Sequence, residues 1–310
     1  MSNVFEEVNK ASPKDGKFTA TSLEDYVCPR KYLFRKVLRL EGTSVSVDLH
    51  FGTSIHAGVA TFYAARGMKR EEAINKFDPR GSYDIQLSQF KLAKLLAIKQ
   101  FTEIWDEGQI QGTDKKCLMT GLKIMSEYCE MYEHDTEKFT PELIECSQWL
   151  PMSNGTTLGA IIDRVSIQDS YITFTDSKTS GWPLTDYYMK QYDNSFQFST
   201  YYYVIEQLLG QCDAIVVDAI KVPYPKAGKD AFRRKSFLRT KIQIAEWENT
   251  YLTKTNRIMD ALSKPEDQWT NLFPQEPRCC SDYGGCKYLP ICTYGLDHPS
   301  VMVDFNIRKD

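Results

Sequence analysis

The spacing of apolar residues predicts a mostly helical first half of the chain. In residues 22–38, apolar side chains such as Leu23, Val27 and Phe34 recur at helical spacing, although Pro29 predicts a break near the start of that helix. The same spacing predicts further helices over residues 48–65, 87–106 and 114–132. Strand signals are weak before residue 142, so helices should dominate this part.

The pattern changes near residue 142, where short segments rich in β-branched residues begin. Residues 143–150, 156–167 and 170–175 are separated by Ser-Asn-Gly and Gln-Asp-Ser turns, which predict three consecutive antiparallel strands. A helix over 195–209, strands over 214–222 and 234–238, and a helix over 243–262 follow. The tail, 273–310, is rich in Pro and Cys and is expected to be irregular.

Composition limits the classes of protein to which the chain can belong. Of its 310 residues, 42% are hydrophobic and 25% charged, which is enough apolar material for a core. The formal net charge of −3 gives no bulk attraction for a polyanion, so a nucleic-acid site must be a local basic patch. The polar N-terminus and the lack of long apolar runs predict a cytoplasmic protein without membrane contact.

Two acidic residues and a lysine stand at matching places on neighbouring predicted strands. Asp163 ends one strand and Asp176 the next, and strand alternation puts Lys178 on the same face as Asp176. Two carboxylates can share Mg²⁺ or Mn²⁺, which would acidify a water for phosphodiester hydrolysis while the lysine positions that water. Alone, Asp-x-Lys is a weak signal, because any exposed strand end can show it.

The order of the surrounding motifs adds more information. Along the chain they are Gly52-x-x-x-His56, Glu145, Gly159-x-x-Asp163-Arg164, Asp176-x-Lys178 and Gln197-x-x-x-Tyr201. This order resembles the PD-(D/E)XK nuclease superfamily, specifically its RecB-like branch. The resemblance implies an α/β fold with a mixed central β-sheet flanked by helices. It also implies a metal site of His56, Asp163 and Asp176, and catalytic roles for Asp163, Asp176, Lys178, Gln197 and Tyr201.

Each of these residues also has an ordinary structural interpretation. His56 can be a hydrogen-bonded interior histidine, and Glu145 a strand-surface acid. Arg164 can pair with a neighbouring carboxylate instead of contacting the DNA backbone. Gln197 and Tyr201 share one helical face and can be routine polar positions on a packed helix.

The chain has nine cysteines and is expected to be intracellular, where disulfide frameworks are rare. Clustered cysteines are therefore considered first as metal or cluster ligands. Cys28, with Cys286, Cys292 and one of the adjacent Cys279 and Cys280, can enclose a [4Fe-4S] cluster. The arrangement resembles the iron–sulfur staple of AddB-type and CRISPR-adaptation nucleases, although the usual Cys-x-x-Cys is missing. We prefer Cys280, because its offset leaves room for the Tyr-Gly-Gly turn.

A zinc ion on the same four cysteines and unligated buried thiols are the alternatives. The remaining cysteines are expected to be small core residues; they are Cys117, Cys129, Cys146 and Cys212.

Two basic stretches are candidate DNA contacts, and either can instead be a solvated face. The first holds Arg30, Lys31 and Arg35, followed by Lys36 and Arg39. The second runs from 226 to 241 and carries Lys226, Lys229, Arg233, Arg234, Lys235, Arg239 and Lys241. With Arg164, the first three residues are the predicted nucleic-acid contacts.

The sequence therefore predicts a metal-dependent DNA nuclease, expected to be an exonuclease acting on single strands or duplex ends in recombination, repair or replication. A helicase or recombination protein is the expected partner. The predicted segments are a flexible N-terminus (1–18), a helical region with Cys28 and His56 (19–140), a nuclease core (141–262) and a cysteine-rich tail (263–310). The alternatives are an iron–sulfur DNA-binding accessory protein with little or no nuclease activity and a structural zinc protein.

Overall fold

The computed structural model describes residues 11–42, 46–81, 83, 86–108, 110–135, 139–222, 230–281, 285–303 and 305–307. The chain folds into two compact units. Unit 1 comprises Met1–Ser44, Ser147–Ile161 and Thr240–Asp310, and unit 2 comprises Val45–Cys146 and Ile162–Arg239. The chain thus alternates between the two units. The boundaries predicted at residues 18, 140 and 262 followed the order of the sequence, and that order does not show which segments pack together.

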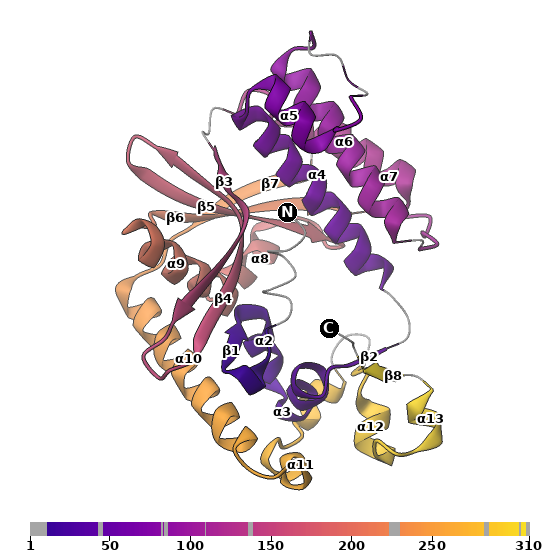
Figure 1. Cartoon of the computed structure of the whole chain (residues 1–310), viewed down its shortest axis with the longest axis vertical. Coiled ribbons are helices and arrows are strands. Elements are labelled where there is room, and N and C mark those ends of the chain that lie inside the picture. The colour runs from indigo at the N-terminus through magenta and orange to yellow at the C-terminus, as the bar shows by residue number, and fades with distance from the viewer. Residues whose placement is uncertain are drawn as a thin grey trace. The chain divides into compact units, whose positions relative to one another are not determined.

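Four helices of unit 2 pack into one apolar cluster (Figure 1). They are α4 (Val47–Gly67), α5 (Arg70–Phe77), α6 (Gln89–Glu107) and α7 (Leu118–Met131). Phe62 of α4, Leu96 of α6 and Ile124 of α7 are fully buried in this cluster. The three predicted helices are confirmed, and α5 was missed because only Ala73 and Phe77 of its eight residues are buried, which leaves little apolar periodicity.

The strands form a six-stranded mixed sheet in the order β1-β4-β5-β6-β7, with β3 also paired to β4. The bounds are β1 (Lys17–Thr19), β3 (Phe139–Pro151), β4 (Thr157–Gln168), β5 (Tyr171–Ser180), β6 (Ala214–Lys221) and β7 (Phe232–Phe237). β5 is antiparallel to β4 and parallel to β6, and β7 is antiparallel to β6. The parallel pair is connected through α8 (Asp186–Met189), η4 (Lys190–Tyr192) and α9 (Phe196–Leu209). The predicted mixed α/β fold with flanking helices is confirmed.

One strand boundary was predicted wrongly, and the error concerns the candidate site. β5 continues to Ser180, so Asp176 and Lys178 lie within the strand instead of beyond its end. Asp163 lies inside β4, within the strand predicted over 156–167. Because Asp176 and Lys178 are polar, hydrophobicity alone placed the end of β5 too early.

In unit 1, β1 pairs in parallel with the start of β4, with Phe18 opposite Leu158. α10 (Lys241–Leu262) is joined to the turn before β4, since Asn154 Nδ2 donates to Thr255 Oγ1 at 3.0 Å. The expectation of a flexible N-terminus is wrong for residues 13–18, which form η1 (Pro13–Asp15) and most of β1. Residues 1–10 lie outside the described residues.

The predicted first helix is divided into four short pieces. They are α2 (Ala20–Glu24), the 3-10 helix η2 (Asp25–Val27), α3 (Pro29–Tyr32) and the π-helix η3 (Leu33–Val37). Pro29 begins α3, so the predicted break is confirmed.

The tail is more regular than its composition predicted. It contains η5 (Glu266–Gln268), α11 (Trp269–Leu272), η6 (Pro277–Cys280), α12 (Leu289–Tyr294), α13 (Pro299–Met302) and β8 (Phe305–Ile307). β8 is antiparallel to β2 (Leu40–Gly42), and Tyr288 Oη donates to the Leu40 carbonyl at 2.8 Å. Both ends of the chain are thereby joined within unit 1.

Among the helices that the structure describes, none combines the length and apolar character needed to cross a membrane.

A buried ionic network joins strands β4, β6 and β7 of unit 2 to helix α7. Asp218 of β6 is fully buried and pairs with both Arg164 of β4 and Arg234 of β7, while Tyr128 of α7 donates to it at 2.5 Å. Burial alone would raise the pKa of Asp218, but the two guanidiniums hold it below its usual range. Asp218 is therefore a charged group whose removal leaves buried positive charge uncompensated.

We expect Asp218→Asn to lower the free energy of unfolding by about 3 to 5 kcal/mol, because breaking a buried pair leaves its partner charges unmatched. Urea denaturation of the variant and the wild type measures this change. Asp169→Asn is the matched control: Asp169 is exposed at a turn with φ of 48°, a conformation that asparagine tolerates. It should change stability by no more than about 0.5 kcal/mol, and equal losses in the two variants would contradict the assignment.

Candidate active site

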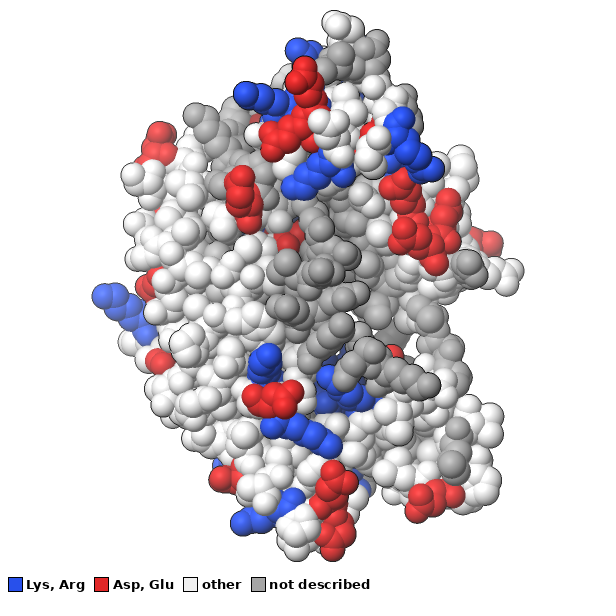
Figure 2. Space-filling model, in the orientation of Figure 1, with Lys and Arg blue, Asp and Glu red and all other residues white. Residues whose placement is uncertain are grey.

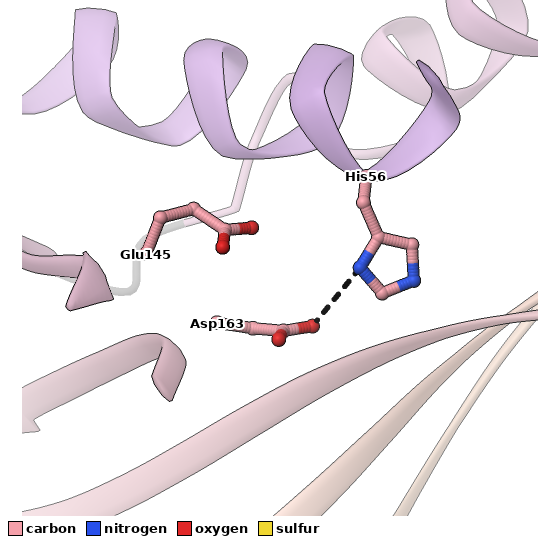
Figure 3. Close-up of side chains that lie close together, drawn as sticks. All are labelled: His56, Glu145 and Asp163. Atoms are coloured by element: carbon pink, nitrogen blue, oxygen red, sulfur yellow. Dashed lines mark ion pairs between the residues drawn. The ribbon is translucent and has the colours of Figure 1, made fainter. Parts of the chain in front are cut away.

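Three side chains from separate elements of unit 2 converge on one point (Figure 3). His56 lies on α4, Glu145 on β3 and Asp163 on β4. Their potential ligand atoms all lie within 4.8 Å of one another, and His56 Nδ1 is 3.4 Å from Asp163 Oδ2. Within the described part of the chain, this is the one group of three or more such residues at that spacing. One nitrogen and two carboxylates in this arrangement suit a divalent cation.

The backbone explains how these side chains reach that point. A β-carbon on Gly52, one helical turn before His56, would lie 3.3 Å from Thr179 Oγ1, so the glycine allows α4 to lie close to β5. Asp163 Oδ2 accepts a hydrogen bond from the Ser177 N–H at 2.8 Å. Glu145 has a φ of 50° within β3, a left-handed conformation that costs a non-glycine residue about 1 to 3 kcal/mol.

Asp176 and Lys178 meet on one face of β5, as strand alternation predicts. Lys178 Nζ lies 2.7 Å from Asp176 Oδ2. The Asp176 side chain is almost fully buried, whereas a quarter of the Lys178 side chain is exposed. The lysine therefore bridges a buried carboxylate and the solvent-facing side of the site.

The carboxylates of Asp163, Glu145 and Asp176 lie close together, and burial removes much of their hydration. Burial raises the pKa of Asp163, and burial followed by the charge of Asp163 raises the pKa of Glu145 well above its usual range. Burial also raises the pKa of Asp176 to about 6, although Lys178 opposes the change. A cation at this point would relieve both the lost hydration and the mutual repulsion.

His56 is neutral near pH 7, which is the form that binds a metal. Burial, followed by the nearby charge of Lys178, lowers its pKa to about 4. Its ring nitrogen consequently keeps a lone pair for a cation, so the interior-histidine interpretation and the ligand interpretation do not conflict here.

Gln197 and Tyr201 lie on the same face of α9, where Gln197 Nε2 donates to Tyr201 Oη at 2.8 Å. The Tyr201 ring packs 4.8 Å from that of Phe174 on β5, and the Phe198 ring lies 5.8 Å from Lys178 Nζ. The pair thus joins α9 to the strand that carries Asp176.

Arg164, predicted as a DNA contact, is instead buried and engaged within the protein. Its side chain is 2% exposed, and its guanidinium pairs with Asp218 and donates to Ser177 Oγ at 2.7 Å. The following residue after Asp163 points to the opposite face of β4, which is the interior. The alternative interpretation, a pair with a neighbouring carboxylate, is the observed one.

The first basic stretch is largely engaged within unit 1. Arg30 Nε donates to the Phe273 carbonyl at 2.8 Å, and its guanidinium also donates to the Thr270 carbonyl. Arg35 donates to both carboxylate oxygens of Asp25 at 3.0 Å, and Lys31 lies 3.5 Å from one of them. Arg35 remains exposed and Lys31 partly exposed, so both stay candidates for a phosphate contact, whereas Arg30 has a structural role.

The second basic stretch is also partly internal. Arg234 belongs to the buried network, and Arg239 is buried, with Nε donating to Ser199 Oγ at 3.1 Å. Lys226 and Lys229 lie outside the described residues. On the face that Figure 2 shows, the coloured Lys and Arg side chains are interspersed with Asp and Glu instead of forming a single-sign patch.

The four predicted cluster cysteines lie in one neighbourhood of unit 1. Burial raises the pKa of Cys292, nearby Arg30 lowers it, and Cys286, Cys28 and Cys280 each raise it. The Cys286 N–H donates to the Cys280 carbonyl at 3.1 Å. No three of these four sulfur atoms, all in described residues, lie within 4.8 Å of one another.

Two features of the site were not predicted. Glu145 was predicted as one of the ordered motifs, with a strand-surface acid as the alternative, but it was not included among the expected metal ligands; its backbone has a φ of 50°. Asp218 was overlooked, although a single acid in the apolar run Ala-Ile-Val-Val-Asp-Ala-Ile indicates a buried charge that needs partners.

Comparison with known proteins identifies the family of the chain. The sequence model of the PD-(D/E)XK nuclease superfamily matches residues 17–293. No curated protein sequence matches the chain. One solved structure with a similar fold, named "Putative exonuclease" and from Eubacterium rectale, is 12% identical, with a TM-score of 0.49 over 81% of this chain and 84% of that one. Because the family match spans most of the sequence, the chain belongs to the PD-(D/E)XK nuclease superfamily.

Proposed function

We propose that the protein is a Mg²⁺- or Mn²⁺-dependent exonuclease that hydrolyses DNA. The observation that carries this proposal is the convergence of His56, Glu145 and Asp163 beside the Asp176–Lys178 pair. Family membership supports nuclease chemistry. The order of the motifs along the chain supports the RecB-like branch, whose activity belongs to recombination, repair or replication and is fed by a helicase or recombination partner.

The residues divide into ligands and groups that act on the reactants. In this proposal His56, Asp163 and Asp176 bind the cation, and Glu145 is a further ligand because its carboxylate shares the same point. The imidazole nitrogen makes the set better suited to Mn²⁺ than to Mg²⁺. The cation supplies positive charge to the scissile phosphate and acidifies a water.

Lys178 acts on the reactants from the partly exposed side of the site. Its ammonium holds the attacking water in line with the phosphorus and stabilises negative charge that develops on the phosphate oxygens. Its ion pair with Asp176 fixes the position of the ammonium before substrate binds. Gln197 and Tyr201 orient the substrate from α9.

We further propose a [4Fe-4S] cluster on Cys28, Cys280, Cys286 and Cys292. The four thiols share one neighbourhood, which supports a common ligand. A tetrahedral zinc ion would draw the sulfur atoms to about 3.8 Å from one another, given Zn–S bonds of about 2.3 Å. A cluster would place one thiolate on each of four irons and so keep the sulfur atoms farther apart, which is why metal analysis distinguishes the two.

Asp176→Ala should abolish cleavage of end-labelled single-stranded and duplex DNA while leaving the fold intact. Removing one of three crowded carboxylates also relieves repulsion, so the melting temperature without metal should stay equal or rise. Mn²⁺ should raise the melting temperature of the wild type and have much less effect on the variant. Asp169→Asn is the control, and full activity in Asp176→Ala would contradict the site.

Lys178→Met should lower kcat by about 100-fold or more and change the affinity for DNA by less than about threefold, because the ammonium acts on the attacking water in the transition state. Single-turnover cleavage and equilibrium binding without metal measure the two quantities separately. Equal losses in rate and affinity would instead identify Lys178 as a simple phosphate contact.

Anaerobically purified wild-type protein should be brown and contain about four irons per chain, and Cys28→Ala should lose that iron. The variant should melt at a lower temperature but remain folded, because Tyr288 and the β2–β8 pair also join the two ends of unit 1. Cys117→Ala, a partly exposed cysteine in unit 2, should keep its iron. Stoichiometric zinc without iron, or unchanged iron in Cys28→Ala, would refute this ligand set.

A further inference from the structure

Two aromatic side chains are exposed just beyond the strand that carries the candidate catalytic lysine. Trp182 is 65% exposed and Tyr187 is 87% exposed. By contrast, Trp105, Trp247 and Trp269 are all buried. A single exposed apolar residue is ordinary, but the exposure of two large aromatic rings within six residues of the chain needs an explanation.

The backbone that carries Trp182 is held firmly. Its N–H donates to Ser180 Oγ at 3.0 Å, and Ser180 Oγ donates back to the Trp182 carbonyl at 3.1 Å. The Ser180 carbonyl in turn accepts from the Val222 N–H at 2.7 Å. The exposure of the indole is therefore a property of an ordered segment and not of a fraying end.

The residues between the two rings are anchored as well. Arg233 of β7 donates to the Leu184 carbonyl at 2.7 Å and pairs with Asp186 at the start of α8. Thr185 accepts from the Tyr188 N–H at 3.1 Å, which fixes the first turn of that helix. Trp182 and Tyr187 are thus presented from a pre-organised backbone, which lowers the entropic cost of binding a ligand.

Positive charge accompanies the rings. The Lys221 ammonium donates to the Gly181 carbonyl, next to Trp182. A phosphate bound beside Trp182 would be stabilised by this ammonium.

Trp182 lies close enough to the candidate active site to bind a nucleic-acid strand that is being cleaved there. Trp182 follows Lys178 by four residues, so their Cα atoms lie within about 14 Å. A nucleic-acid strand whose phosphate lies at Lys178 would therefore be within reach of Trp182. Stacking on a ring requires an unpaired base, which a duplex does not offer without strand opening.

We propose that Trp182 and Tyr187, with Lys221, form a binding site for single-stranded nucleic acid, in which bases stack on the two rings and the backbone contacts the lysine. This site deepens the proposed function, because it makes an unpaired strand the form of substrate that enters the active site. We call it the stacking site.

The test is equilibrium binding of a fluorescein-labelled oligothymidylate to the full-length protein in EDTA, which prevents cleavage. Trp182→Ala should raise the Kd by roughly 5- to 150-fold, the range for loss of one stacked base. Trp182→Phe, which keeps a stacking ring, should stay within about threefold of the wild type. Tyr171→Ala is the matched control, because Tyr171 is also an exposed aromatic on β5 but lies at the opposite end of the strand.

A second readout separates stacking from a general loss of affinity. Trp182→Ala should change the affinity for a blunt duplex much less than the affinity for the single strand. Unchanged single-strand affinity in Trp182→Ala, or an equal loss for both substrates, would overturn the stacking site. So would a loss of the same size in Tyr171→Ala.

Cleavage assays with Mn²⁺ distinguish this proposal from the proposed function. If Trp182 determines single-strand binding but the wild type cleaves no DNA, the stacking site stands and the nuclease proposal fails. If Asp176→Ala abolishes cleavage while Trp182→Ala binds as the wild type does, the nuclease proposal stands and the stacking site fails.

Discussion

Buried carboxylates are stable only when positive charge lies beside them, and the ionic contacts of unit 2 meet that requirement. Asp218 is neutralised by Arg164 and Arg234, and Asp176 by Lys178. Asp163 and Glu145 lie beside a neutral histidine, and burial raises the pKa of both carboxyls although Arg164, and for Asp163 also Lys178, oppose the change. A divalent cation at this point would stabilise both carboxylates.

Adjacent residues on β4 perform these two tasks on opposite faces of the strand. Asp163 turns toward His56 and the candidate metal position, while Arg164 turns into the buried network with Asp218. The network joins β4 to β6 and β7, so ionic contacts hold the strand that presents Asp163. The arginine that follows Asp163 is explained by these contacts.

Unit 1 uses different means to hold its ends together. Arg30 donates to carbonyls near Phe273, the Tyr32 ring stacks on that of Phe273 with centroids 6.4 Å apart, and Tyr288 bonds to Leu40. These contacts bring the Cys28 segment to the cysteine-rich tail before any cluster is considered. The proposed [4Fe-4S] site would therefore form where the polypeptide already brings its ligands together.

The sequence by itself determined most elements and the family. Apolar periodicity located α4, α6, α9 and α10, and motif order identified His56, Asp163, Asp176 and Lys178, because local spacing and residue chemistry are written in the chain. Tertiary structure alone decided that Glu145 joins the group, that Arg164 and Arg234 are buried, and that β5 runs on to Ser180. Those outcomes depend on a left-handed φ and on charges paired between distant strands, and neither follows from the composition or period of a local segment.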